Sequence, residues 1–276
     1  MATDSNCPRT ALVLGGGGSR GAVGVGLYKA LVELGIAIDL IVCSSIGAVN
    51  GAFIAAGMSP TELESRWKSL RTADVIGSRW QFLRLLTGAS SAFNNRSLRN
   101  LLRRMLPVRS FSELRIPLAI VTTDLQTGET IVLTEGDLID AILASTALPG
   151  LFPPIAWRGR RLVDGGLSNN VPIDLAVERG ANQVIGMLCG CTKSLPGRAN
   201  FVTVLGQSFS LALNARYRCD AQMYKPQAQL HILEPCFEPG LDLDFDYAAT
   251  LIQPAYEYAL DHLARRNLTP MGSHRD

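Results

Sequence analysis

Short apolar runs alternate with amphipathic segments along the first 190 residues of the chain. The apolar runs predict strands at residues 11–14, 40–43, 116–123, 130–134, 161–164 and 182–188. Helical spacing falls between them, at residues 22–34, 46–56, 137–144 and 174–179, and a capping-box pattern at Ser59 and Glu62 starts a further helix. Since strands and helices alternate with short connections, we expect an α/β fold with a mostly parallel sheet covered on both faces.

The C-terminal part has a weaker pattern. Helical spacing predicts helices at residues 201–222 and 247–265, and an apolar run predicts a strand at residues 229–233. No internal repeat and no linker-like segment divides the sequence. We therefore expect a single domain over residues 1–276, in which the motif-bearing core covers about 10–190 and residues 191–276 pack on it or complete it.

Composition narrows the class of protein. The chain has 276 residues, of which 47% are hydrophobic and 18% charged, and its net charge of +2 gives no nucleic-acid-binding signature. The six cysteines lack zinc-site spacing, and we expect free thiols in a reducing compartment. Residues 1–10 do not resemble a secretory signal, and no apolar run is long enough to span a membrane, so we expect a cytoplasmic protein, with peripheral membrane contact left open.

Residues 75–112 form a basic stretch without any Asp or Glu. Its arginines are Arg79, Arg84, Arg96, Arg99, Arg103, Arg104 and Arg109. Leucines recur at helical spacing within it, which indicates a packed helix with a solvated cationic face. The alternative is a cap over the active site that contacts anionic membrane through the segment 79–109, because basic side chains are attracted to such surfaces.

Residues 39–51 predict a sharp turn from a strand into a helix of small residues. Such a turn exposes a hydroxyl at its tip and leaves backbone N–H groups of the helix start nearby. The spacing selects Ser45 rather than Ser44 as the candidate nucleophile, since the nucleophile of this turn stands two residues before a glycine, here Gly47. An ordinary tight turn of an α/β protein is the alternative.

A glycine-rich loop at residues 15–21 follows the first strand and opens the first helix. One interpretation is a dinucleotide site, with Asp39 as the ribose partner, although Asp39 precedes the second strand instead of ending it. The other is an oxyanion site, since a glycine loop at the start of a helix offers unobstructed N–H groups to a negative charge. In a parallel sheet this loop and Ser45 follow neighbouring strands, so the loop faces the serine.

A serine nucleophile needs a base. The three histidines are His231, His262 and His274. None has a position that favours catalysis, because His231 lies in an apolar strand and the others lie in a terminal helix and the tail. Asp164 is the better candidate, since it ends a strand before Gly165 and Gly166, which permit close approach to another loop. A simple turn role for Asp164 is the alternative.

Three motifs occur in an order that resembles the patatin-like phospholipases, lipid acyl hydrolases with a Ser–Asp dyad. They are GGGGSRG (15–21), CSSIG (43–47) and DGG (164–166). Further segments whose sequence resembles the family lie at 121–125, 127–129, 145–149, 152–154 and 169–172. The resemblance covers about residues 10–190. It departs from the family at Cys43, where a glycine is usual, and the larger side chain there is expected to crowd the strand–helix contact.

The resemblance implies a three-layer α/β sandwich that hydrolyses lipid esters without metal or cofactor. Carried over, Ser45 is the nucleophile and Asp164 the base. The oxyanion donors are Gly16, Gly17 and Gly18, and the supporting residues are Arg20, Gly47, Gly165 and Gly166. Two other functions remain open: a non-catalytic lipid- or partner-binding module, for which Cys43 would mark a decayed site, and a dinucleotide-binding oxidoreductase.

Overall fold

The structure, a computed structural model, describes residues 9–78, 88, 90–189, 201–237 and 244–266. An eight-stranded sheet forms its centre, in the order β5-β6-β3-β2-β1-β7-β8, with β4 also paired to β3. The strands are β1 (Thr10–Leu14), β2 (Leu40–Ser44), β3 (Leu118–Asp124), β4 (Thr130–Leu133), β5 (Ile155–Trp157), β6 (Arg160–Asp164), β7 (Gln183–Met187) and β8 (Gln229–Leu233).

Five neighbouring strands, β3, β2, β1, β7 and β8, run parallel. Most of their residues are apolar, and β1, β2, β3 and β7 are buried along their whole length because both faces of the sheet are covered there. Along β1, for example, Leu12 and Leu14 enter one hydrophobic core, whereas Ala11 and Val13 enter the other. Two cores on opposite faces of one sheet confirm the expected three-layer α/β class.

The other strands make the sheet mixed. β4 and β6 both pair antiparallel with β3, and β5 pairs antiparallel with β6. Short connections explain this, because a parallel pair needs a long crossover and residues 125–129 between β3 and β4 cannot supply one. β5 and β6 form a hairpin through Arg158 and Gly159, whose φ angles of 47° and 80° suit a tight two-residue turn.

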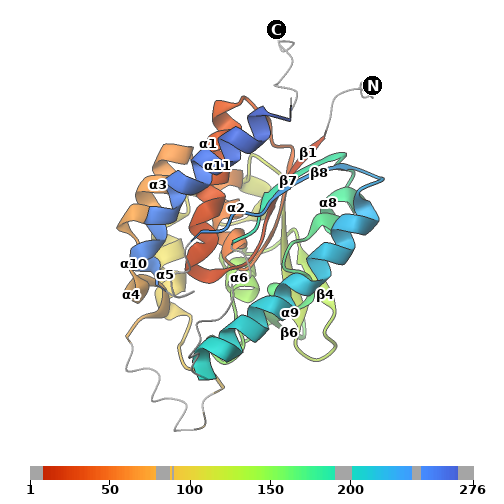
Figure 1. The fold of residues 1–276 in the computed structure, drawn as a ribbon. Coiled ribbons are helices and arrows are strands. Elements are labelled where there is room, and N and C mark those ends of the chain that lie inside the picture. The colour runs from red at the N-terminus through yellow and green to blue at the C-terminus, as the bar shows by residue number, and fades with distance from the viewer. Residues whose placement is uncertain (1–8, 79–87, 89, 190–200, 238–243, 267–276) are drawn as a thin grey trace.

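One face of the sheet carries most of the helices (Figure 1). They are α1 (Val23–Glu33), α2 (Ile46–Ala55), α3 (Pro60–Ser69), α4 (Thr72–Ile76), α5 (Arg96–Met105), α6 (Leu138–Ser145), α10 (Phe245–Ala248) and α11 (Ile252–Ala264). The capping box predicted at the start of α3 is confirmed, since Ser59 and Glu62 cap each other. Helix α11 packs along α1, which brings C-terminal residues onto the first helix of the chain.

The opposite face is covered by α7 (Gly166–Asn169), α8 (Ile173–Glu178) and the long α9 (Phe201–Tyr224). In Figure 1, α9 runs diagonally across this face beside α8. Strand β8 pairs with β7 at the far edge of the same sheet. The C-terminal elements therefore contribute to both outer layers and to the sheet itself.

The cysteines differ from expectation at one residue. Cys43 and Cys219 are free thiols, but Cys236 is disulfide-bonded. The expectation that all thiols are free is therefore wrong at Cys236. Within the described ranges no helix is both long and apolar enough to cross a membrane.

Candidate active site

Ser45 stands at the tip of the turn between β2 and α2. Its backbone has φ 54° and ψ −127°, a region that non-glycine residues rarely adopt. The turn brings the start of α2 against the end of β1, where a Cβ on Gly47 would lie 2.1 Å from the carbonyl oxygen of Leu14. Gly47 is therefore required by a close backbone approach.

Ser145 holds this strained turn in place. The backbone N–H of Ser45 donates to Ser145 Oγ at 2.9 Å, and that hydroxyl donates to the carbonyl oxygen of Val121 at 2.6 Å. Ser145 is fully buried at the end of α6. No role was assigned to Ser145 from the sequence. The one feature that could have indicated it is its position in the segment 145–149, whose sequence resembles the family.

The structure brings Ser45 and Asp164 together. Ser44 of β2 is level with Val121 of β3, and Asp164 of β6 is level with Thr122, the next residue along β3. Because β6 runs antiparallel to β3, its last residue ends beside the Ser45 turn. Ser45 Oγ donates to Asp164 Oδ2 at 2.6 Å.

Asp164 is almost excluded from water, with 3% of its surface exposed. Burial raises the pKa of this carboxyl to about 6, while hydrogen bonds from Ser45 and from the Gly166 N–H oppose the rise. The Gly166 N–H donates to Asp164 Oδ1 at 2.8 Å. Gly165 is needed for this approach, since a Cβ there would lie 2.1 Å from the carbonyl oxygen of Val121. The carboxylate can thus serve as a base near neutral pH.

The glycine loop faces the serine. A Cβ on Gly16 would lie 2.9 Å from Ser45 Cβ, and a Cβ on Gly17 would likewise clash with Cys189 Cβ. The Gly16 N–H donates to Asn170 Oδ1 at 3.0 Å, so this amide already has a partner within the protein. Gly18 begins the short 3-10 helix η1 (Gly18–Ala22) that leads into α1.

Arg20 and Cys43 both lie against the protein interior. Arg20 belongs to η1 and is half-buried, with its Nε atom shielded from solvent. Cys43 is fully buried in β2, and a Cβ on Gly51 of α2 would lie 3.1 Å from its sulfur. Gly51 therefore makes room for the sulfur that occupies the strand–helix contact. Burial raises the pKa of the Cys43 thiol, which disfavours the reactive thiolate.

Asp39 does not lie near the glycine loop. It precedes β2, at the opposite end of the parallel strands from Ser45, and its Oδ2 accepts the N–H of Thr10 at 2.9 Å. An acid at that edge cannot hold the ribose of a dinucleotide bound at Gly16–Gly21. The geometry therefore counts against the oxidoreductase alternative.

The described histidines also lie away from Ser45. His231 is in β8, which is separated from β2 by β1 and β7, so roughly 14 Å of sheet lies between those strands. Its pKa is lowered by burial and by Arg266. His262 stacks on Tyr258 in α11, and His274 lies outside the described residues. The described residues also contain no cluster of His, Cys, Asp or Glu able to hold a metal ion.

The protein has a mixed sheet covered by helices and a serine at a strand–helix turn. These features define a class of α/β proteins in which hydrolytic sites lie at such turns. The profile of one family, described as Patatin-like phospholipase, matches residues 12–177. The chain therefore belongs to the patatin-like phospholipase family, as the motif order predicted.

Curated relatives share this region. The chain is 36% identical over 182 residues to patatin-like phospholipase domain-containing protein 7 of Rattus norvegicus, covering 65% of this chain and 13% of that protein. It is 36% identical over 188 residues to patatin-like phospholipase domain-containing protein 6 of Homo sapiens, again covering 65% of this chain and 13% of that protein. An uncharacterized NTE family protein of Mycobacterium bovis is 34% identical over 197 residues, 70% of this chain and 52% of that protein. The chain thus spans a small part of the mammalian relatives.

Solved structures share the fold. Full-length ExoU of Pseudomonas aeruginosa, crystallised with SpcU, superposes with a TM-score of 0.52 at 16% identity, covering 94% of this chain and 53% of that chain. A second structure of this complex gives a TM-score of 0.51 at 19% identity, with coverages of 94% and 52%. These similarities support the same α/β architecture.

Proposed function

We propose that this protein is a serine-dependent lipid acyl hydrolase of the esterase or phospholipase A type. One observation carries the proposal: the 2.6 Å hydrogen bond from Ser45 Oγ to the buried Asp164 carboxylate. A serine hydroxyl is a weak nucleophile by itself and is activated by a base within hydrogen-bonding reach. Membership of the patatin-like phospholipase family supports lipid esters as the substrate class.

In the first half-reaction, Ser45 Oγ attacks the ester carbonyl carbon while its proton passes to Asp164 Oδ2. The carbonyl oxygen becomes an oxyanion, which we assign to the backbone amides of Gly17 and Gly18. Gly16 faces the nucleophile as well, but its N–H donates to Asn170, so it holds the loop in place. Removal of one oxyanion donor typically lowers kcat by about 10²–10³-fold.

The tetrahedral intermediate then collapses. The alcohol leaves with the proton from Asp164, and the acyl group remains on Ser45 as an ester. A water molecule attacks this acyl-enzyme and gives a proton to Asp164, and collapse of the second intermediate releases the fatty acid and returns the proton to Ser45 Oγ. The same carboxyl group acts in turn as base and acid, which suits a pKa of about 6.

We also propose that α5 contacts anionic membrane surfaces. Arg96, Arg103 and Arg104 are exposed, whereas Leu98 and Leu102 pack into the core. Two arginines of the basic segment are used within the protein. Arg99 pairs with Asp140 at 2.6 Å, and Arg109 donates to backbone carbonyls at the end of α5. Arg79 and Arg84 lie outside the described residues. The exposed arginines would attract anionic headgroups.

The test is hydrolysis of p-nitrophenyl esters of increasing chain length, and of a phospholipid, by wild-type protein and three variants. Ser45→Ala and Asp164→Asn should each lose activity by at least about 10²-fold. Ser44→Ala is the matched control, because its buried hydroxyl has no hydrogen-bond partner among the residues that the structure describes. Full activity in Ser45→Ala would refute the proposal, and an inactive wild type would favour a non-catalytic binding module.

A further inference from the structure

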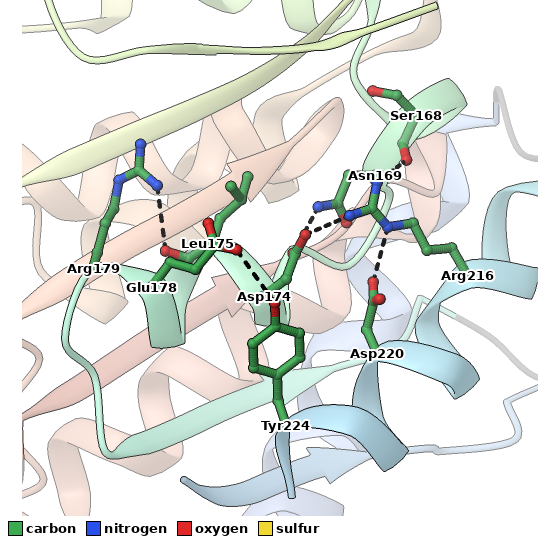
Figure 2. Close-up of polar contacts among 9 residues, drawn as sticks. All are labelled: Ser168, Asn169, Asp174, Leu175, Glu178, Arg179, Arg216, Asp220 and Tyr224. Atoms are coloured by element: carbon green, nitrogen blue, oxygen red, sulfur yellow. Dashed lines mark hydrogen bonds and ion pairs between the residues drawn. The ribbon is translucent and has the colours of Figure 1, made fainter. Parts of the chain in front are cut away.

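Arg216 of α9 contacts two neighbouring helices and its own helix through separate nitrogen atoms (Figure 2). Its Nη1 donates to the carbonyl oxygen of Ser168 in α7 at 2.9 Å. Its Nη2 pairs with Asp174 of α8, and its Nε donates to Asp220, one turn further along α9, at 3.0 Å. One guanidinium therefore joins α7, α8 and α9.

Asp174 extends this link to the end of α7. Its Oδ1 accepts the side-chain N–H of Asn169 at 2.7 Å, while its Oδ2 binds Arg216 (Figure 2). Asn169 and Asp174 are 1% and 5% exposed, so the bond between them forms away from water and is stronger than a surface contact. The Arg216 side chain is 43% exposed, and its pair with Asp174 is shielded on the Asp174 side. The last residues of α7 are thus fixed by side chains from both following helices.

The segment fixed in this way is the one that follows the catalytic carboxylate. Only Gly165 separates Asp164 from α7. Thr123 Oγ1 donates to the Asp164 carbonyl at 2.8 Å and lies 2.9 Å from Ser168 Oγ. At the other end of α7, Asn170 accepts the Gly16 N–H. Residues 164–170 therefore position both the carboxylate and the glycine loop around Ser45.

We propose that Arg216 is a positioning residue, which holds residues 164–170 so that Asp164 meets Ser45 and Asn170 meets Gly16. The inference rests on the proposed hydrolase function and adds to it a residue outside the family-matched region 12–177. It gives α9 a role in catalysis without contact with substrate. Small misplacements of reacting groups are costly, since about 1 Å can lower a rate by roughly 10²-fold.

The test must separate two effects of removing Arg216: the loss of its positive charge and the loss of its hold on residues 164–170. Removal of Arg216 leaves the carboxylates of Asp174 and Asp220 close together and largely shielded from water. Burial and the neighbouring Asp174 already raise the pKa of Asp220, and Arg216 opposes this rise. The double variant Arg216→Ala/Asp220→Asn removes the repulsion and still lacks the bond to the Ser168 carbonyl.

The experiment compares the full-length wild type, Arg216→Ala, the double variant and Arg218→Ala. Arg218 is an exposed arginine two residues away and serves as the matched control. We expect kcat for a short-chain ester to fall by roughly 10- to 100-fold in Arg216→Ala, with KM changed less than about twofold. We also expect the pH midpoint of activity to rise, because a weaker Ser45 bond no longer lowers the pKa of Asp164. The double variant should recover thermal stability but not kcat.

Hydrogen exchange at residues 164–170 gives a readout independent of activity. We expect faster exchange there in Arg216→Ala and in the double variant, and unchanged exchange in Arg218→Ala. Unchanged exchange and unchanged kcat in Arg216→Ala would overturn the inference, as would full recovery of kcat in the double variant. An inactive wild type would refute the proposed hydrolase function, and exchange would still decide whether Arg216 orders this segment.

Discussion

At the scale of single residues, the site depends on a carboxyl group that is kept out of water. The pKa of Asp164 is raised to about 6 by burial, so its basic form predominates only above that pH. We therefore predict that kcat/KM for a neutral ester rises with pH through a midpoint near 6, with about a tenth of the plateau rate at pH 5. A midpoint near 4, typical of an exposed Asp, would contradict the assignment of Asp164 as base.

The same group has a consequence for stability. The pKa of Asp164 in the folded protein lies above its ordinary value, so protonation of Asp164 stabilises the folded state. This stabilisation is present below pH 4 and is lost as the pH rises through 6, by about 3 kcal/mol at most. We predict that urea unfolding of wild type and Asp164→Asn shows a difference in unfolding free energy that changes over this window. A pH-independent difference would contradict the burial of an ionisable group there.

Sequence motifs predicted Ser45 and Asp164 as the nucleophile and the base, but they did not predict the residues that position the Ser45 turn and the glycine loop. Ser145 and Asn170 act through hydrogen bonds to the backbone of Ser45 and Gly16, which lie 100 and 154 positions earlier in the chain. Such contacts depend on how the sheet is ordered, which periodicity does not encode. Arg216 was similarly hidden, because nothing in the local pattern of α9 distinguishes it from its exposed neighbours.

At the scale of elements, the β2–α2 contact tolerates a cysteine where the family usually has glycine. Cys43 faces the backbone of α2 at Gly51, and its thiol is buried. We predict that Cys43→Gly leaves a cavity and lowers the free energy of unfolding by about 1–3 kcal/mol, while ester hydrolysis is retained. Urea unfolding and kcat measure the two effects. Loss of hydrolysis in this variant with its fold intact would implicate Cys43 in the chemistry and refute the assignment to Ser45.

The parallel strands and their helices were predictable because each has a buried apolar run or a helical repeat. The hairpin of β5 and β6 was not fully predicted, since β5 is only Ile155–Trp157 and is partly exposed. Its turn at Arg158 and Gly159 was a local signal that could have indicated an antiparallel pair. This pair matters for the site, because the reversed direction of β6 delivers Asp164 to the Ser45 turn.

At the scale of the whole molecule, we propose that residues 1–276 fold as one domain. β8 extends the sheet beside β7, and α11 packs on α1, so elements beyond residue 190 cover the family-matched core. The position of Arg216 supports the same view, since α9 reaches the segment after Asp164. The C-terminal part would then complete the catalytic unit.

The exposed arginines of α5 give the membrane proposal a direct test. We predict that Arg103→Glu/Arg104→Glu weakens cosedimentation with vesicles that contain phosphatidylserine, since each basic residue near the surface contributes about 1 kcal/mol. Added salt should weaken binding of the wild type in the same way. Arg265→Glu is the control, because that exposed arginine lies at the C-terminal end of a different helix, α11. Equal binding by wild type and the α5 variant would contradict the proposal.

The central claim is that Asp164 activates Ser45, and labelling by a fluorophosphonate tests it most directly. The account predicts modification of Ser45 alone, located by mass spectrometry, at a rate that rises with pH through about 6. It predicts labelling at least about 10²-fold slower in Asp164→Asn and absent in Ser45→Ala. Undiminished labelling in Asp164→Asn, or modification of another residue in place of Ser45, would contradict it.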